Sequence, residues 1–351
     1  MLIISNDIKS AVRSILGYLT ISITPLVFYY ILKYEYSFFE KFLKLATIIY
    51  LTVGLVQVIF DRNFMSFLLN RVSTSEDRGV VSLTPEPTFY GVVCLFFILI
   101  FLSLNVKNKE KYIYMLLFQI IFLAKSSMVI LLLAVFLFYH IIFKINIKVL
   151  SLTLLLIMKF YVLYKNYELD LWNYNIRPIY LLKHFLENPT DVFLIDASVN
   201  DRLSAIYFSF KGFFDNYMLP NGFGTYESYL NSELDKQNIF WWVSISNRIM
   251  SYYGTILFEL GFIGLIIPFT YSLIILKAYR HNLRDSLLYL FFINTTLLTA
   301  IPLSFPLVGV YIATLIYRSN NHENTLSNNT SDKIIRYESQ KRLQQRTGQK
   351  R

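Results

Sequence analysis

The chain has 351 residues, of which 55% are hydrophobic and 16% are charged, and its formal net charge at pH 7 is +10. This composition excludes an ordinary water-soluble domain, in which about a quarter of the residues would be charged. The positive charge does not indicate nucleic-acid binding, because the basic residues fall in short loops and in the C-terminal tail. We therefore expect an integral membrane protein with no nucleic-acid partner.

Long apolar runs predict an all-α, polytopic transmembrane bundle of about nine or ten spans. Most runs approach the roughly 20 residues that cross a bilayer core. Helices are expected because the bilayer offers no water to unpaired backbone groups. The two runs on either side of Lys125 are short, and they form either one hairpin or a partly re-entrant pair. The expected spans are residues 14–32, 41–60, 86–105, 111–124, 126–143, 148–164, 252–276, 285–301 and 303–317.

Basic residues in the short loops predict the orientation of the bundle, since cytoplasmic loops carry an excess of lysine and arginine. Their alternation places residues 61–85 and 165–250 outside and the tail from Arg318 inside. Lys9 and Arg13 disagree, because both would then lie outside. Either the first span is misjudged or residues 1–13 form an interfacial helix. The loops marked as cytoplasmic carry Lys33, Lys41 and Lys44; Lys107, Lys109 and Lys111; Lys144 and Lys148; and Lys277, Arg280 and Arg284.

Four segments follow from this topology. Residues 1–164 form an N-terminal transmembrane bundle, and residues 165–250 form a large, partly helical extracytoplasmic loop. Residues 251–317 return the chain to the membrane as C-terminal helices. Residues 318–351 have almost no apolar face to bury, which predicts a disordered, basic cytoplasmic tail. The expected location is thus multi-pass in a cytoplasmic membrane.

The extracytoplasmic loop is about 85 residues long, far beyond an ordinary connection. One helix is predicted over residues 177–187, where a proline follows the first residue and another proline follows the end. A second is predicted over residues 200–212, with Asn200 or Asp201 as its N-cap. Residues 220–224, which read Pro-Asn-Gly-Phe-Gly, predict a tight turn. An ordered loop over a membrane bundle is typical of a lid for a lipid-linked substrate.

Two lysines, Lys125 and Lys159, fall near the outer ends of predicted spans. A lysine inside a span costs about 2.5–3.5 kcal/mol and is functional by default. At the outer end of a span, such a lysine would meet a diphosphate headgroup of the outer leaflet. The alternative is that both side chains extend to the membrane interface and bind nothing.

Three arginines of the loop, Arg177, Arg202 and Arg248, offer guanidinium groups that bind phosphate oxygens in bidentate geometry. Arg202 would lie in the first turn of the second predicted helix, where the helix N-terminus adds partial positive charge. An anion site there is one interpretation. The other is a surface salt bridge to Asp196 or Asp201.

Among the carboxylates, Glu86 stands out because Pro85 and Pro87 fix the backbone on either side of it at the mouth of a span. It is a candidate for acceptor binding or for a general base, and otherwise a solvated loop residue. His184 is the only histidine predicted outside, as a base near neutral pH or as a structural histidine. Glu259 falls within a span and either polarises a partner or braces the fold. No nucleotide-binding loop, zinc spacing or nucleophile elbow occurs, so neither a metal nor an organic cofactor is expected.

Several short motifs occur in a fixed order over roughly residues 80–270. They are Pro85–Gly91 (PEPTFYG), Ala124–Ser127 (AKSS), Asn200–Arg202 (NDR), Asn221–Gly224 (NGFG), Ser246–Arg248 (SNR) and Phe258–Gly264 (FELGFIG). Their order beside one long external loop resembles the Wzy-type O-antigen and capsular polysaccharide polymerases, which belong with the O-antigen ligases. Ser246 stands where ligases commonly carry a histidine, which favours a polymerase and removes a histidine base. The pair Lys125-Ser126 stands where many relatives have a serine followed by an arginine, so the charge is kept but the bidentate fork is lost.

The resemblance implies glycosyl transfer at the outer face of a bacterial inner membrane, between oligosaccharide repeat units linked to undecaprenyl diphosphate. The growing chain would leave its diphosphate carrier for a hydroxyl of the incoming unit, and cations would stabilise the charge that develops on the diphosphate. Arg202 and Glu86 are the expected catalytic residues. Membrane lipids, and a flippase and a chain-length regulator of the same pathway, are the expected partners. The expected substrate-binding residues are Arg248, Lys125, Arg177, Lys159, Tyr226 and His184.

Two other functions stay open. An O-antigen ligase would transfer the finished chain to lipid A-core. A flippase or transporter would move the lipid-linked unit without reacting with it. Transporters usually show paired repeats and broken helices, and the single dominant loop of this chain disfavours such symmetry.

Overall fold

A computed structural model describes residues 8–69, 78–144, 194–234, 249–299 and 301–321, together with a few isolated positions between 159 and 190. The predicted span 148–164 and most of the predicted helix 177–187 lie outside the described residues. The described parts of the chain are helical, with turns between the helices and no β-strand. The predicted all-α class is confirmed over these residues.

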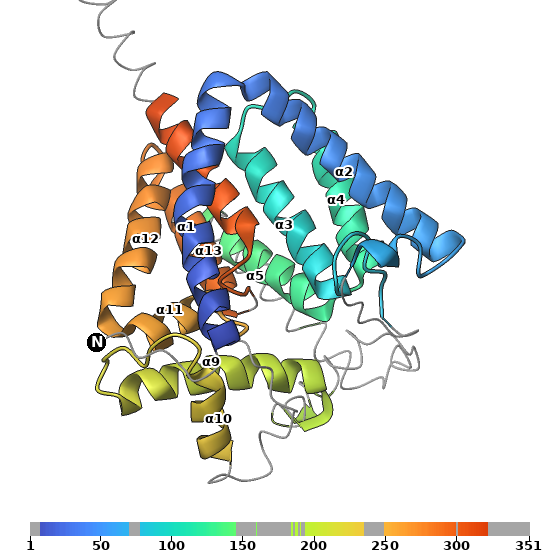
Figure 1. Cartoon of the computed structure of the whole chain (residues 1–351). Helices are drawn as coiled ribbons and strands as arrows, with labels where there is room; N and C mark the ends of the chain where they lie inside the picture. Colours follow the sequence, from blue (N-terminus) through green and yellow to red (C-terminus); the bar gives the residue numbers. More distant parts are fainter. Residues whose placement is uncertain are drawn as a thin grey trace, which may run out of the picture.

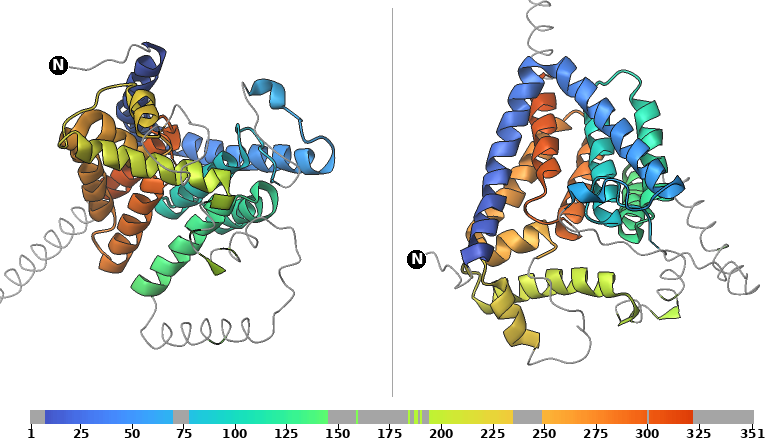
Figure 2. Two further views of the ribbon diagram at one scale, coloured as in Figure 1. Left: turned by 90° about the horizontal axis from the view of Figure 1, so that it is seen from below. Right: turned by 45° about the vertical axis from the view of Figure 1, so that its right-hand side comes forward.

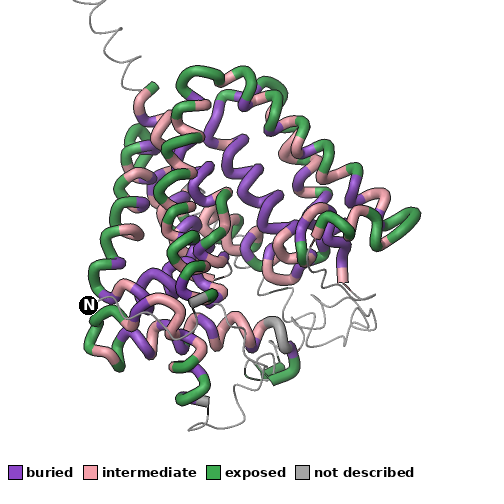
Figure 3. The backbone as a smooth tube through the Cα atoms, viewed as in Figure 1, coloured by how far each residue is buried: buried purple, intermediate pink, exposed green. Residues whose placement is uncertain are grey.

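The N-terminal half of the described chain forms apolar helices that pack side by side. They are α1 (Ile8–Tyr34), α2 (Tyr36–Ile59), a 3₁₀ turn (Ser66–Leu68), α3 (Pro87–Ser103), α4 (Lys109–Phe118), a π-helical turn (Gln119–Ala124) and α5 (Ser127–Lys144). α3 carries apolar side chains all round, as a helix at the centre of a bundle requires, and almost all of its residues are buried. Figure 3 shows this central burial beside the exposed faces of α1 and α2.

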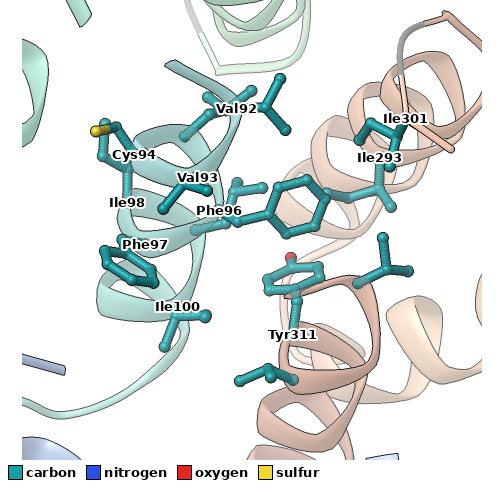
Figure 4. Close-up of a cluster of buried hydrophobic side chains, with 14 of the residues drawn as sticks. Val92, Val93, Cys94, Phe96, Phe97, Ile98, Ile100, Ile293, Ile301 and Tyr311 are labelled. Carbon is teal, nitrogen blue, oxygen red and sulfur yellow. The ribbon is translucent and has the colours of Figure 1, made fainter. Parts of the chain in front are cut away.

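The C-terminal half adds amphipathic helices and further apolar ones. They are α9 (Ala197–Asp215), α10 (Tyr226–Leu234), α11 (Tyr252–Leu260), a 3₁₀ turn (Gly261–Leu265), α12 (Ile266–Ala278), α13 (Leu283–Thr299) and a last helix over residues 306–321. This last helix packs on α3, where the rings of Phe96 and Tyr311 meet edge to face with centroids 6.2 Å apart. Figure 4 shows these two rings together with Ile293 of α13, so three helices share one core.

Three helices are long and apolar enough to cross a membrane: Lys9–Tyr34, Tyr36–Ile59 and Tyr252–Ala278. Large apolar side chains such as Leu26 on α1 and Phe42 on α2 are more than half exposed, as lipid-facing residues are. The chain is therefore a multi-pass membrane protein. Helices fill every other predicted span that the structure describes, although α3 and α5 are shorter than a full span.

The predicted span 252–276 is not straight. Gly261 has φ +61°, and a Cβ there would lie 2.5 Å from the carbonyl oxygen of Met218, so only glycine fits this position. The chain consequently changes direction between α11 and α12 (Figure 1). α11 lies near one end of the bundle, and α12 runs along it.

α9 lies across that same end of the bundle, with α10 beyond it (Figures 1 and 2). The N-terminus of α1 lies at this end too, whereas the helix over residues 306–321 finishes at the opposite end. α1 is one continuous helix from Ile8. Residues 8–13 are therefore part of the first span and not a separate interfacial helix, so Lys9 and Arg13 do lie on the side of α9.

Candidate functional site

α9 carries Arg202, but the helix begins earlier than predicted. The Asp196 carboxylate accepts a hydrogen bond from the backbone N–H of Val199 at 3.0 Å, which makes Asp196 the N-cap in place of Asn200 or Asp201. Arg202 is consequently in the second turn. The field of a helix N-terminus falls off within the first turn, so its predicted contribution to an anion site at Arg202 is smaller than expected.

α9 also ends later than predicted, at Asp215 instead of Gly212. Gly212 lies inside the helix, and a Cβ at this position would come within 2.5 Å of the Phe258 ring. The glycine thus allows α9 and α11 to pack closely and does not end the helix. The predicted tight turn follows, and Asn221 anchors it by donating from Nδ2 to the carbonyl oxygens of Gly212 and Phe258, both at 3.1 Å.

Glu86 and Asp201 lie close enough to act on each other electrostatically. Burial raises the pKa of Asp201, the neighbouring Arg202 guanidinium lowers it, and the Glu86 carboxylate raises it further. The charge of Asp201 acts in turn on Tyr226, whose pKa is raised mainly by burial. The structure thus gathers two predicted catalytic residues and one predicted binding residue around Asp201. We call Glu86, Asp201, Arg202 and Tyr226 the Asp201 cluster.

Backbone geometry holds Glu86 at the mouth of α3. The residue is extended, with φ −146° and ψ 152°, and precedes Pro87 at the first position of the helix. Its carbonyl oxygen accepts from the Tyr90 N–H at 3.1 Å and from the Thr84 hydroxyl at 2.9 Å. Its carboxylate makes no capping hydrogen bond and is half-buried. The side chain is therefore not used to cap α3.

Lys125 lies at a break between helices and not inside a span. It ends the π-helical turn with φ 44°, a left-handed conformation that is strained for lysine, and it is exposed. The side chain is therefore not buried within the protein, and its binding of a diphosphate stays a prediction. The next residue, Ser126, donates to the Thr88 hydroxyl at 3.3 Å. This contact places the Lys125 segment beside the first turn of α3, close to Glu86.

Tyr226, the first residue of α10, belongs to a small core between α9, α10 and α11. Its ring meets Phe258 edge to face, with centroids 5.3 Å apart, and is only 5% exposed. Ala205 and Phe208 of α9 pack in the same core. The core fixes α10 against α9. Substrate binding by Tyr226 stays a prediction, and little of its ring is open to solvent.

The other predicted binding residues lie in the segment before α9 or outside the described residues. His184 is half-buried, with Nδ1 3.9 Å from Oε2 of Glu187, a contact within one helical turn. Lys159 is helical and exposed. Arg177 and Arg248 lie outside the described residues, so their predicted roles stay predictions.

Residues from α1 reach the same end of the molecule, which the sequence did not predict. The Ser14 hydroxyl donates to Oε1 of Glu259 at 2.6 Å, across 245 residues of chain. Arg13 lies next to it on α1. The predicted alternation of spans had put Lys9 and Arg13 on the loop side, although their positive charge argued against it.

The arrangement combines two cations with carboxylates at the end of a membrane bundle. Arg202 and Lys125 can neutralise a phosphate group, and Glu86 can accept a hydrogen bond or a proton from a hydroxyl. Within the described residues, no three histidine, cysteine or acidic side chains lie together as metal ligands would. No protein-family model, curated protein or solved structure matches the chain.

Proposed function

We propose that this protein is a polysaccharide polymerase. It joins oligosaccharide repeat units carried on undecaprenyl diphosphate, by glycosyl transfer at the outer face of a bacterial cytoplasmic membrane. In this proposal the segment that contains α9 and α10 is extracytoplasmic and the C-terminal tail is cytoplasmic. The resemblance in motif order suggested this reaction, and the position of the Asp201 cluster supports it.

The supporting observation is that Arg202, Lys125 and Glu86 belong to segments that lie at one end of the bundle (Figure 1). Asp201, the neighbour of Arg202 on α9, lies within electrostatic reach of Glu86. Ser126, the neighbour of Lys125, donates a hydrogen bond to Thr88, which is two residues from Glu86. A lipid-linked diphosphate has its charge at the membrane interface and its lipid in the bilayer. Cations at the end of apolar helices match that distribution.

Different residues of the site act on the leaving group and on the acceptor. The acceptor hydroxyl oxygen bonds to the anomeric carbon of the donor sugar, while the bond from that carbon to the diphosphate oxygen breaks. The diphosphate leaves with the bonding electron pair, and Arg202, assisted by Lys125, stabilises its charge. The hydroxyl proton passes to a carboxylate, for which Glu86 is our candidate.

A reaction with purified protein tests the proposal. Defined undecaprenyl-diphosphate repeat units are incubated with the protein in detergent, and the products are separated by length. We expect a ladder from the wild-type protein and a rate at least about 100-fold lower for Arg202→Ala, since one removed charge-stabilising donor costs about 10²–10³ in rate. Arg284→Ala is the matched control, because Arg284 is exposed in the first turn of α13.

Each outcome separates one function from another. A wild-type ladder that persists in Arg202→Ala rejects the role of Arg202. Absence of a ladder from correctly matched substrate rejects the polymerase, and movement of the intact unit across vesicles would then favour the transporter. Transfer of a finished chain to lipid A-core, without any ladder, would favour the ligase.

A further inference from the structure

A second polar site lies where α1 meets the turn before α10. A half-open cavity of about 70 Å³ lies there between the first turns of α1, the start of α10 and α11. Its lining includes one guanidinium, of Arg13, and two carboxylates, of Glu227 and Glu259. Neither Arg13 nor Glu227 has a role in the reaction proposed above.

Glu259 is the buried group of this pocket. Its side chain is 4% exposed, and Oε1 accepts the 2.6 Å hydrogen bond from Ser14. Oε2 makes no hydrogen bond of ordinary geometry within the described residues, although Tyr18 and the backbone N–H of Gly224 face the same carboxylate. A buried carboxylate oxygen without a full set of donors carries a desolvation cost. The residue lines the pocket, so a ligand hydroxyl there would add a donor to the surroundings of this carboxylate.

Arg13 supplies donors on the other side of the pocket. It is half-buried on α1, and in the described part of the chain it makes neither a hydrogen bond nor an ion pair. Its guanidinium is therefore available to a ligand oxygen. The hydroxyls of Ser14, Thr255 and Ser304 complete the lining with groups that both donate and accept.

Close packing fixes the pocket walls relative to one another. Gly224 has φ +72°, and a Cβ there would lie 2.8 Å from the backbone nitrogen of Ala11. The turn before α10 can therefore approach the start of α1 only through a glycine. On the other side, the N–H of Gly222 donates to the carbonyl oxygen of Glu259 at 3.3 Å. The backbone of Glu259 is thus held both by its own helix and by the turn before α10.

We propose that this pocket binds the hydroxyl-bearing edge of the acceptor sugar, with Glu259 accepting and Arg13 donating hydrogen bonds. The inference rests on the polymerase function proposed above and names the acceptor site within it. A phosphate group does not suit the pocket, because two carboxylates face a single guanidinium there. A simple cation does not suit it either, because Arg13 would repel it. A neutral polyol uses both kinds of group.

The pocket adjoins the Asp201 cluster. Tyr226 lines the pocket and also lies within the electrostatic reach of Asp201. A sugar held by Glu259 and Arg13 would therefore present its next hydroxyl toward the cluster that binds the donor diphosphate. Holding both reactants in one geometry is worth several orders of magnitude in rate.

Binding of a lipid-free acceptor tests the inference. The probe is the oligosaccharide of the defined repeat unit used in the ladder reaction, released from its carrier by mild acid so that neither lipid nor diphosphate remains. We expect saturable binding to the full-length protein in detergent by titration calorimetry, undisturbed by inorganic pyrophosphate. Glu259→Gln should weaken binding at least about tenfold, because it removes a charge-assisted acceptor. Glu40→Gln, on α2 at the other end of the bundle, should leave binding unchanged.

Two further variants test the pocket at other positions, so that the experiment does not depend on the folding of Glu259→Gln. Arg13→Gln removes the donor side, and Ser304→Phe fills the mouth of the pocket from an exposed position. Both should weaken binding about tenfold or more. Wild-type affinity in Arg13→Gln and Ser304→Phe, or no saturable binding by the wild-type protein, overturns the inference.

The ladder reaction separates this inference from the function on which it rests. A normal ladder with an unchanged acceptor KM in Glu259→Gln rejects the pocket and keeps the polymerase. Loss of oligosaccharide binding in Glu259→Gln, in a protein that never forms a ladder, rejects the polymerase and keeps a sugar-binding pocket.

Discussion

Asp201 is the residue at which the electrostatics of the proposed site are most finely balanced. Burial and the Glu86 carboxylate disfavour its charge, and Arg202 favours it, with a raised pKa as the net result. The folded protein therefore holds the Asp201 proton more tightly than the unfolded chain does. Bringing a diphosphate beside Arg202 would add negative charge and raise the pKa of Asp201 further.

A raised carboxyl pKa predicts the pH dependence of stability. The contribution of protonated Asp201 is complete below the ordinary aspartate pKa of 3.8 and is lost as pH rises through the higher pKa of the folded protein. Asparagine cannot ionise, so Asp201→Asn avoids this loss. We expect the melting temperature of the variant to increase relative to wild type between about pH 4 and neutral pH. Thermal unfolding in detergent across that range measures the difference.

Glu86→Gln is the control for this effect, because it removes the carboxylate that raises the pKa of Asp201. In the Glu86→Gln background, the Asp201→Asn difference should vary less with pH. If the difference in melting temperature between Asp201→Asn and wild type is the same at every pH, Asp201 has an ordinary pKa. If that difference varies with pH equally in both backgrounds, Glu86 does not act on Asp201.

Among the elements, α9 and α10 are joined by one lysine. Lys211 donates to Asp215 on its own helix at 2.9 Å and to Glu233 of α10, whose side chain is 8% exposed. Hydrogen bonds to both carboxylates raise the pKa of Lys211. Tyr229 of α10 also donates to Asp215 at 2.8 Å. The pair of helices that covers the end of the bundle thus has a charged contact as well as the Tyr226 core.

Lys211→Met should loosen this pair, because a buried Glu233 carboxylate loses its cation. We expect a loss of about 1–3 kcal/mol in stability, the range for leaving a buried polar group without its partner. The double variant Lys211→Met with Glu233→Gln should recover most of it, since no buried charge then remains. Thermal unfolding of both variants in detergent measures the effect. Equal losses in the single and double variants would mean that the contact is merely a surface ion pair.

Helices and turns were predicted correctly where a local sequence pattern determines their position. Apolar runs placed the helices, and the glycines and Pro220 placed the turn before α10. The limits of α9 were wrong because a tertiary contact decided them: Gly212 accommodates the Phe258 ring instead of ending the helix. The N-cap was wrong because Asp196, upstream of the expected start, satisfies the first turn.

The site was predictable in part. Glu86, Arg202 and Lys125 were selected by their chemistry and by motif order, and the structure brings them to one end of the bundle. The contact between Ser14 and Glu259 was beyond prediction, because the two residues are 245 positions apart and no periodic pattern connects them.

Across the whole molecule, the two ends of the bundle carry different loops. α9, α10 and the start of α1 share one end, and the turn between α3 and α4 lies at the other (Figure 1). Lys9 on α1 and Tyr217 after α9 lie at the first end, and Lys107 lies at the opposite end. All three side chains are exposed, with Tyr217 at 87%.

These positions predict the sidedness of the protein in its membrane. Cys94 is the only cysteine and is buried, so a Cys94→Ala background allows single cysteines to be placed at Lys9, Tyr217 and Lys107. With a charged, membrane-impermeant maleimide on intact spheroplasts, we expect Lys9→Cys and Tyr217→Cys to react. Lys107→Cys should react only after permeabilisation, because a bilayer that crosses α1, α2 and α3 separates it from the reagent.

Labelling of Lys107→Cys in intact spheroplasts with protection of Tyr217→Cys would put α9 in the cytoplasm and remove the proposed site from its substrate. Opposite labelling of Lys9→Cys and Tyr217→Cys would break the shared end on which the acceptor pocket depends.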